Sequence, residues 1–97
     1  MEEVATAVSC EIRLASFGGS RELTAVATSS ALIASSYQFD VTAVSAGGKA
    51  VTSQGNDMTL AAGETVLGTA NIGATSHFTA TLNLSWAGGS TSCSQRG

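Results

Sequence analysis

The sequence predicts an all-β fold, an immunoglobulin-like β-sandwich of about seven antiparallel strands. Apolar and polar residues alternate with period two in several stretches, and no stretch carries the apolar stripe of a helix. Residues typical of turns separate these stretches about every ten positions, a spacing typical of sandwich domains. A small closed barrel is the alternative that the same pattern allows.

The strands follow from this alternation, taken in order along the chain. In the first stretch, apolar residues alternate with Ser9, Glu11 and Arg13, which predicts one apolar and one polar face. The predicted strands cover residues 8–14, 23–28, 37–44, 49–54, 58–60, 65–72 and 78–86. Residues 29–36 stay open between a single helical turn and an irregular crossover, because a short apolar run fits both.

Glycine-containing segments mark the predicted turns at residues 18–20, 47–48, 54–57, 62–64 and 87–89. Gly68 interrupts the strand over 65–72, which indicates a bulge or a close approach of another segment.

A chain of 97 residues fits one domain. We expect this domain over residues 8–93, with tails at 1–7 and 94–97. Because much of the 43% apolar fraction is alanine, the large side chains of the core are few. The predicted core is Ile12, Leu14, Leu23, Tyr37, Phe39, Val41, Leu60, Phe78, Leu82, Leu84 and Trp86.

The two cysteines lie near opposite ends of the predicted domain. Cys10 is in the first strand, and Cys93 follows the last predicted strand. A disulfide between them would close nearly the whole chain and stabilise it by about 4–5 kcal/mol at most. Two unpaired cysteines are the alternative. A redox-active pair is not expected, since there is no Cys-x-x-Cys spacing.

The charge balance argues against nucleic acid as a partner. Four Lys and Arg stand against seven Asp and Glu, for a net charge of −3. No apolar run is long enough to insert into a membrane. No signal peptide is visible, so Met1 reads as an initiator placed before a mature chain. The low-charge composition favours export over a cytosolic protein with free thiols.

The residues offer little for catalysis, and we expect no enzyme activity, no cofactor and no metal site. His77 is the single histidine, which with two cysteines falls short of a zinc set. No G-x-S-x-G segment places a nucleophile. The N-glycosylation sequence at Asn83 lies inside a predicted strand, so we interpret it as a chance match.

Several segments together resemble the CsgH curli assembly chaperones of the CsgC-like amyloid inhibitor family. They are residues 9–14, residues 37–41, Gly47-Gly48, Gln54-Gly55 and the late Cys93. The resemblance implies a periplasmic immunoglobulin-like protein, expected to be monomeric, that binds amyloid-forming curli subunits transiently and suppresses their premature assembly. CsgC carries a Cys-x-Cys motif, and since this sequence has none, no redox role is transferred.

Charged residues near the first strand are the candidate partner-binding set. They are Glu11, Arg13, Arg21 and Lys49. We hypothesise that the basic members steer acidic amyloid subunits, while the alternative is that they are solubility charges. Two other functions remain open: a structural subunit of a surface fibre, and an adhesion or carbohydrate-binding module.

Overall fold

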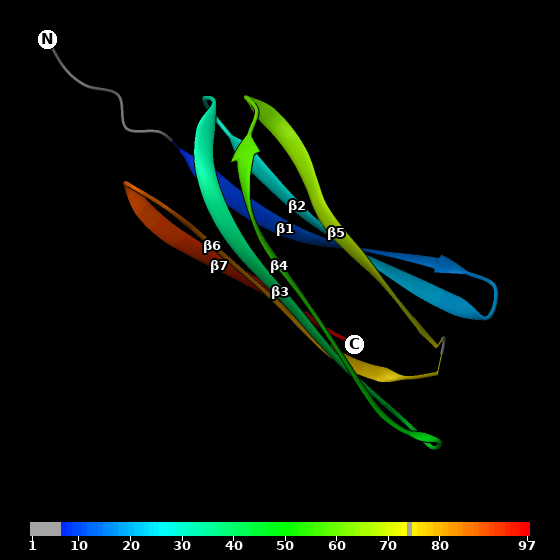
Figure 1. The fold of residues 1–97 in the computed structure, drawn as a ribbon. Helices are drawn as coiled ribbons and strands as arrows, with labels where there is room; N and C mark the ends of the chain where they lie inside the picture. The colour runs from blue at the N-terminus through cyan, green and yellow to red at the C-terminus, as the bar shows by residue number, and fades with distance from the viewer. Residues whose placement is uncertain (1–6, 74) are drawn as a thin grey trace, which may run out of the picture.

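A computed structural model of the chain describes residues 7–73 and 75–97. Residues 1–6 of the predicted N-terminal tail lie outside the described residues. The described chain is all β, with seven antiparallel strands and no helix among these residues (Figure 1). The strands are β1 (Val8–Phe17), β2 (Ser20–Ser29), β3 (Ile33–Ser45), β4 (Gly48–Leu60), β5 (Gly63–Gly73), β6 (His77–Trp86) and β7 (Gly89–Arg96).

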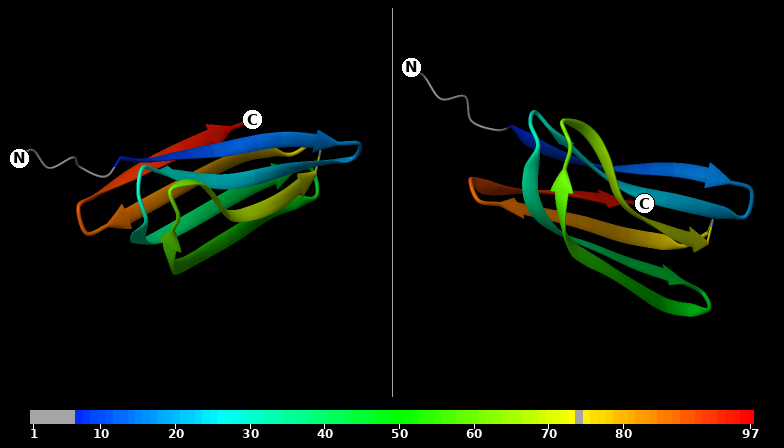
Figure 2. Two further views of the ribbon diagram at one scale, coloured as in Figure 1. Left: turned by 90° about the horizontal axis from the view of Figure 1, so that it is seen from above. Right: turned by 45° about the horizontal axis from the view of Figure 1, so that its top comes forward.

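The strands form two twisted sheets packed face to face (Figures 1 and 2). The first sheet has the order β1-β2-β5, and the second has the order β4-β3-β6-β7. The predicted all-β sandwich is confirmed, and two separate sheets rule out the closed barrel. The immunoglobulin-like type of the sandwich stays a prediction. The sandwich has four edge strands, β1 and β7 on one side and β4 and β5 on the other.

The predicted turn at residues 54–57 is wrong. Gly55 pairs with Gln38 within a register that runs without a shift from Ile33 opposite Leu60 to Ser45 opposite Gly48. The two short strands predicted over 49–54 and 58–60 are therefore one 13-residue strand, β4. Pairing along the full length of β3 outweighs the local turn preference of the Gly-Asn-Asp sequence.

The last strand, β7, was not predicted from the sequence. It pairs with β6 from Trp86 opposite Gly89 to Thr79 opposite Arg96. Its Ser, Thr and Gln residues carry no apolar alternation, so the period-two signal is missing. Cys93 consequently lies inside a strand, and this strand continues past the predicted domain end at residue 93.

The segment left open over residues 29–36 is not helical. Strand β2 ends at Ser29 and β3 begins at Ile33. Ser29 is buried, and its hydroxyl donates to the carbonyl of Ala31 at 2.6 Å, which holds the chain in a bend between the two sheets.

Gly68 stands beside a β-bulge, as its place in the strand predicted. In the β2–β5 pair, Ala25 lies opposite Gly68 and the next residue, Val26, lies opposite Val66. Leu67 is therefore the extra residue of the bulge. The alternative reading of close approach also holds, because a side chain at Gly68 would collide with Gln54 from the other sheet.

The core lies between the two sheets. Eight predicted members are buried: Ile12, Leu23, Phe39, Val41, Leu60, Phe78, Leu82 and Leu84. Tyr37 and Trp86 are partly buried and pack against them. The prediction for Leu14 is wrong, since it is 39% exposed. Leu14 lies in the C-terminal half of β1, past the disulfide-bonded Cys10, and this end of β1 reaches beyond the end of β7 (Figure 2).

Further apolar residues, mostly alanines, are buried beyond the predicted set, and all of them except the outward-facing Val26 belong to this core. The additional buried apolar residues are Ala25, Val26, Ala27, Ala43, Leu67, Ala70, Ile72 and Ala80. Alanines in both sheets let the two sheets approach closely around a few large side chains.

Candidate functional site

The predicted disulfide between Cys10 and Cys93 is present and joins the two sheets. It links β1 to β7 with a Cα–Cα distance of 6.0 Å across a sequence separation of 83 residues. Both cysteines pack against the core. The bond holds two edge strands together on one side of the sandwich, where β1 and β7 run side by side (Figure 2). It also fits an oxidising compartment.

Glu11 and Arg13 lie together on the outer face of the first sheet. The Nε atom of Arg13 donates to Glu11 at 2.9 Å, and its Nη2 atom contacts Glu64 of β5. These two carboxylates raise the pKa of Arg13, with Glu64 making the larger contribution through its hydrogen bond. The cluster lies over Val26, which is buried although it faces outward from the core cluster. The positive charge of Arg13 is therefore flanked by negative charge.

Arg21 lies in a different place, at one end of the sandwich interior. Its register position opposite the buried Ile72 places it on the inner face of β2. The guanidinium lies 5.1 Å from the ring centre of Phe78, and Nη2 donates to the carbonyl of Ser76. This half-buried arginine covers the end of the core, which is a packing role.

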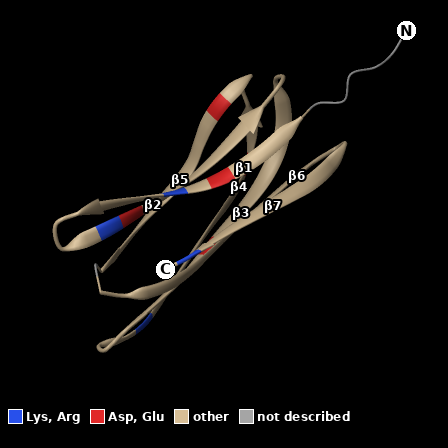
Figure 3. Cartoon of the chain, turned by 180° about the vertical axis from the view of Figure 1, so that it is seen from behind, with Lys and Arg blue, Asp and Glu red and all other residues tan. Residues whose placement is uncertain are grey.

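Lys49 is the second residue of β4, in the other sheet and next to the β3–β4 turn. Within the described chain it forms no ion pair. Figure 3 shows how few and scattered the charges are over both sheets. The structure thus brings Glu11 and Arg13 together and leaves Arg21 and Lys49 apart from them.

Two side chains of the second sheet reach across the sandwich to the bulged strand β5. The Tyr37 hydroxyl donates to the carbonyl of Leu67 at 3.0 Å. The Gln54 amide donates to the carbonyl of Thr69 at 2.8 Å. Because β5 is a bulged strand at the edge of its sheet, some of its carbonyls have no ladder partner, and these two bonds supply donors for two carbonyls of this strand. They also fix the spacing of the two sheets on the side without the disulfide.

Hydroxyl and amide side chains dominate the outer face of the second sheet. On it, the pKa of Asp40 is lowered by hydrogen bonds from Gln38 and then Ser53, which favour the carboxylate. The carboxylate therefore stays ionised at neutral pH and holds two side chains, Gln38 on its own strand and Ser53 on β4.

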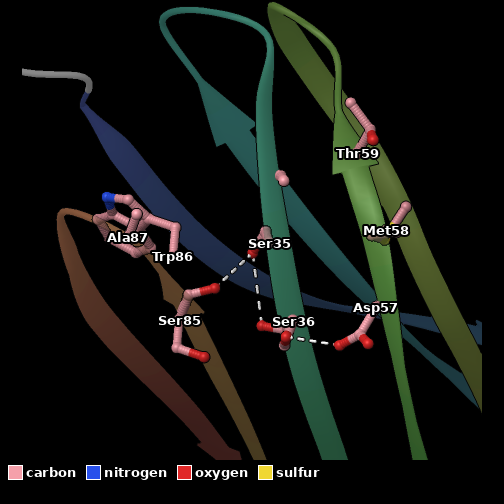
Figure 4. Close-up of a pocket in the computed structure, with 9 residues that line it drawn as sticks. Ser35, Ser36, Asp57, Met58, Thr59, Ser85, Trp86 and Ala87 are labelled. Carbon is pink, nitrogen blue, oxygen red and sulfur yellow. Dashed lines mark hydrogen bonds between the residues drawn. The ribbon is translucent and has the colours of Figure 1, made fainter.

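A shallow hollow opens where β3, β4 and β6 lie side by side, with Trp86 at one side (Figure 4). The Ser36 hydroxyl donates to Asp57 at 2.7 Å, and the Ser35 hydroxyl donates to the carbonyl of Ser85 at 3.0 Å. Both hydroxyls therefore form hydrogen bonds between neighbouring strands.

His77, the single histidine, is an exposed residue at the start of β6.

Residues 7–73 and 75–97 contain neither a metal-binding cluster nor a membrane-spanning helix. No group of three or more His, Cys, Asp or Glu could hold a metal ion. No helix in this part of the chain is long and apolar enough to cross a membrane.

The fold matches solved structures over nearly its whole length. R. palustris CsgH superposes with a TM-score of 0.80 at 25% identity, covering 93% of this chain and 92% of CsgH. The predicted resemblance to CsgH is confirmed. The E. coli curli protein CsgC superposes with a TM-score of 0.73 at 14% identity, covering 95% of this chain and 97% of CsgC, which shows the fold.

The same fold also occurs in a much larger enzyme. Parabacteroides merdae β-glucuronidase matches 92% of this chain with a TM-score of 0.63 at 14% identity, but only 13% of the enzyme takes part. The sandwich alone therefore does not determine a function. No protein-family model and no curated protein sequence matches the chain.

Proposed function

We propose that this chain is a curli-related, periplasmic chaperone-like protein that delays amyloid assembly of curli subunits by transient binding. The observation that carries the proposal is the match to CsgH, which spans nearly the full length of both chains. The similarity to the E. coli curli protein CsgC supports it at the level of the fold. The disulfide supports the compartment, because the periplasm is oxidising. We further propose that the protein acts by binding and has no enzyme activity.

The test is the kinetics of fibre formation by a purified curli subunit, followed by thioflavin fluorescence. We expect sub-stoichiometric amounts of this protein to lengthen the lag phase. The isolated sandwich domain of the β-glucuronidase is the control for fold, since it shares the architecture at 14% identity. An unchanged lag would contradict the proposal. Fibre formation by the chain alone would instead support a structural subunit, and glycan binding would support an adhesion module.

Electrostatic steering is a separate part of the proposal. Because Arg13 is flanked by two carboxylates and Arg21 is half-buried, Lys49 is the member of the set best placed to act on an acidic subunit. Replacing Arg13, Arg21 and Lys49 with serine should shorten the lag if steering contributes, most strongly at low salt. A lag in this variant equal to that with the parent protein would rule out steering by these residues.

A further inference from the structure

Three of the four edge strands are protected. Unpaired edges of a sheet can recruit other strands, so proteins cover, bend or charge them. On one side of the sandwich, β1 and β7 lie against each other and are held by the Cys10–Cys93 disulfide. On the other side, β5 is bent by its bulge, and its Leu67 and Thr69 carbonyls already accept hydrogen bonds from side chains.

The fourth edge strand, β4, lacks these protections. It is 13 residues long, and its register against β3 continues without a shift. All of its residues except Gln54, Met58 and Leu60 are exposed. Between Lys49 and Asp57 the strand carries no charge, and the chain has no proline. Within the part of the chain that the structure describes, β3 is the one strand that pairs with β4.

The backbone of β4 offers hydrogen-bonding groups on its open side. Phe78 and Gly97 exchange two backbone hydrogen bonds, of 2.9 and 3.2 Å, at the end of the β6–β7 pair. In antiparallel sheets successive residues of a strand point these groups alternately to opposite neighbours. The same alternation, followed from β6 through β3 to β4, directs the backbone N–H and C=O groups of the odd-numbered residues of β4 away from β3. Val51, Ser53 and Gly55 are the odd-numbered residues in the uncharged centre of the strand.

We propose that this open edge of β4, residues 49–57, is where the chain pairs with an extended, charge-poor strand of an amyloid-forming subunit. This inference rests on the proposed function and names its contact surface. Main-chain hydrogen bonds recognise any extended segment, and the uncharged stretch selects segments of low charge. Low charge and absence of proline are also what amyloid-forming segments require. Lys49 and Asp57 at the two ends favour a strand with opposite charges facing them.

Pairing at this edge would stop fibre growth for a geometric reason. A strand added to β4 continues the twist of the second sheet, whereas fibril sheets are nearly flat and stack against a mating sheet. The inner face of β4 is directed toward β5, as the 2.8 Å bond from Gln54 to Thr69 shows. The first sheet therefore occupies space on the side where a mating fibril sheet would pack.

The experiment compares substitutions at matched positions on two edges. Val51→Pro removes an outward N–H of β4 and leaves the bonds to β3 intact. Val51→Lys keeps the backbone and places a charge in the uncharged stretch. Ser94→Pro and Ser94→Lys are the controls, because Ser94 has the same outward orientation on β7, the edge tied to β1. Circular dichroism checks that each variant folds. If Val51→Pro does not fold, the comparison rests on Val51→Lys.

We expect both Val51 variants to need about tenfold more protein for the same lag of a curli subunit, and the Ser94 variants to match the parent. Amide exchange with the subunit present should slow at residues 51, 53 and 55. Folded Val51 variants with the parent's potency would overturn the inference and leave the proposed function standing. If the parent itself does not lengthen the lag, the proposed function fails. The inference would also be overturned if the parent protein sedimented as a dimer and the Val51→Lys variant as a monomer. The edge of β4 would then pair with a second copy of the chain.

Discussion

Removing the Cys10–Cys93 disulfide should destabilise the fold strongly, because the bond closes almost the whole chain. The sequence separation is 83 residues, for which the chain-entropy model gives about 4.5 kcal/mol at 25 °C. Domains of this size have a total free energy of unfolding of about 5–15 kcal/mol. Since the core relies on alanines around a few large side chains, we expect the protein without the bond to be marginally stable.

The assay is urea unfolding of the parent and of the variant with both Cys10→Ser and Cys93→Ser, followed by circular dichroism. With a slope of about 1–2 kcal/mol per molar urea, the midpoint should fall by about 2–4 M. The parent in reductant is the matched control, since it loses the bond with no change of side chain. The reasoning would be refuted if variant and reduced parent both unfolded within about 0.5 M of the oxidised parent. A larger effect in the variant alone would point to the serine side chains.

Three further outcomes follow from individual hydrogen bonds. Tyr37→Phe leaves the Leu67 carbonyl without its donor and should lower the free energy of unfolding by about 1–2 kcal/mol; an unchanged urea midpoint would mean that water replaces the hydroxyl. Gly68→Ala should displace the Gln54 side chain and lower the free energy of unfolding by about 1 kcal/mol. The loss should be smaller in a Gln54→Ala background, and additive effects of the two substitutions would argue against the contact. Asp40 has a lowered pKa, so it contributes stability above its ordinary pKa of about 3.9, and this is lost as pH falls through the folded value. Asp40→Asn should therefore destabilise at pH 7 and much less near pH 3; equal effects on the urea midpoint at both would contradict this.

The β-class and most of the core could be predicted from the sequence, whereas the disulfide was one of two alternatives and the structure shows it formed. The class and the core follow from local patterns: period-two alternation identifies a half-buried strand wherever large apolar residues mark its inner face. The same rule explains the failures. Strand β7 has too few apolar residues to show the period. Leu14 has the right period but is 39% exposed, in the half of β1 that reaches beyond the end of β7.

The candidate site could be predicted only in part. Sequence placed Glu11 and Arg13 on one outer face, but the second carboxylate that pairs with Arg13 is Glu64, which is 51 residues away. Arg21 shares the face of Leu23, two residues on, but its contacts with Phe78 and the Ser76 carbonyl join segments more than 50 residues apart. No local pattern carries such information, because both contacts depend on which strands become neighbours.

The open edge of β4 is the feature that tertiary structure alone decided. Locally, Gly55 and its neighbours read as a turn, and only the pairing with β3 made them part of a continuous strand. Whether a strand lies at an edge depends on sheet order, and whether that edge is protected depends on distant groups such as the disulfide and Tyr37. The chain's composition made this edge uncharged, and the topology left it unpaired.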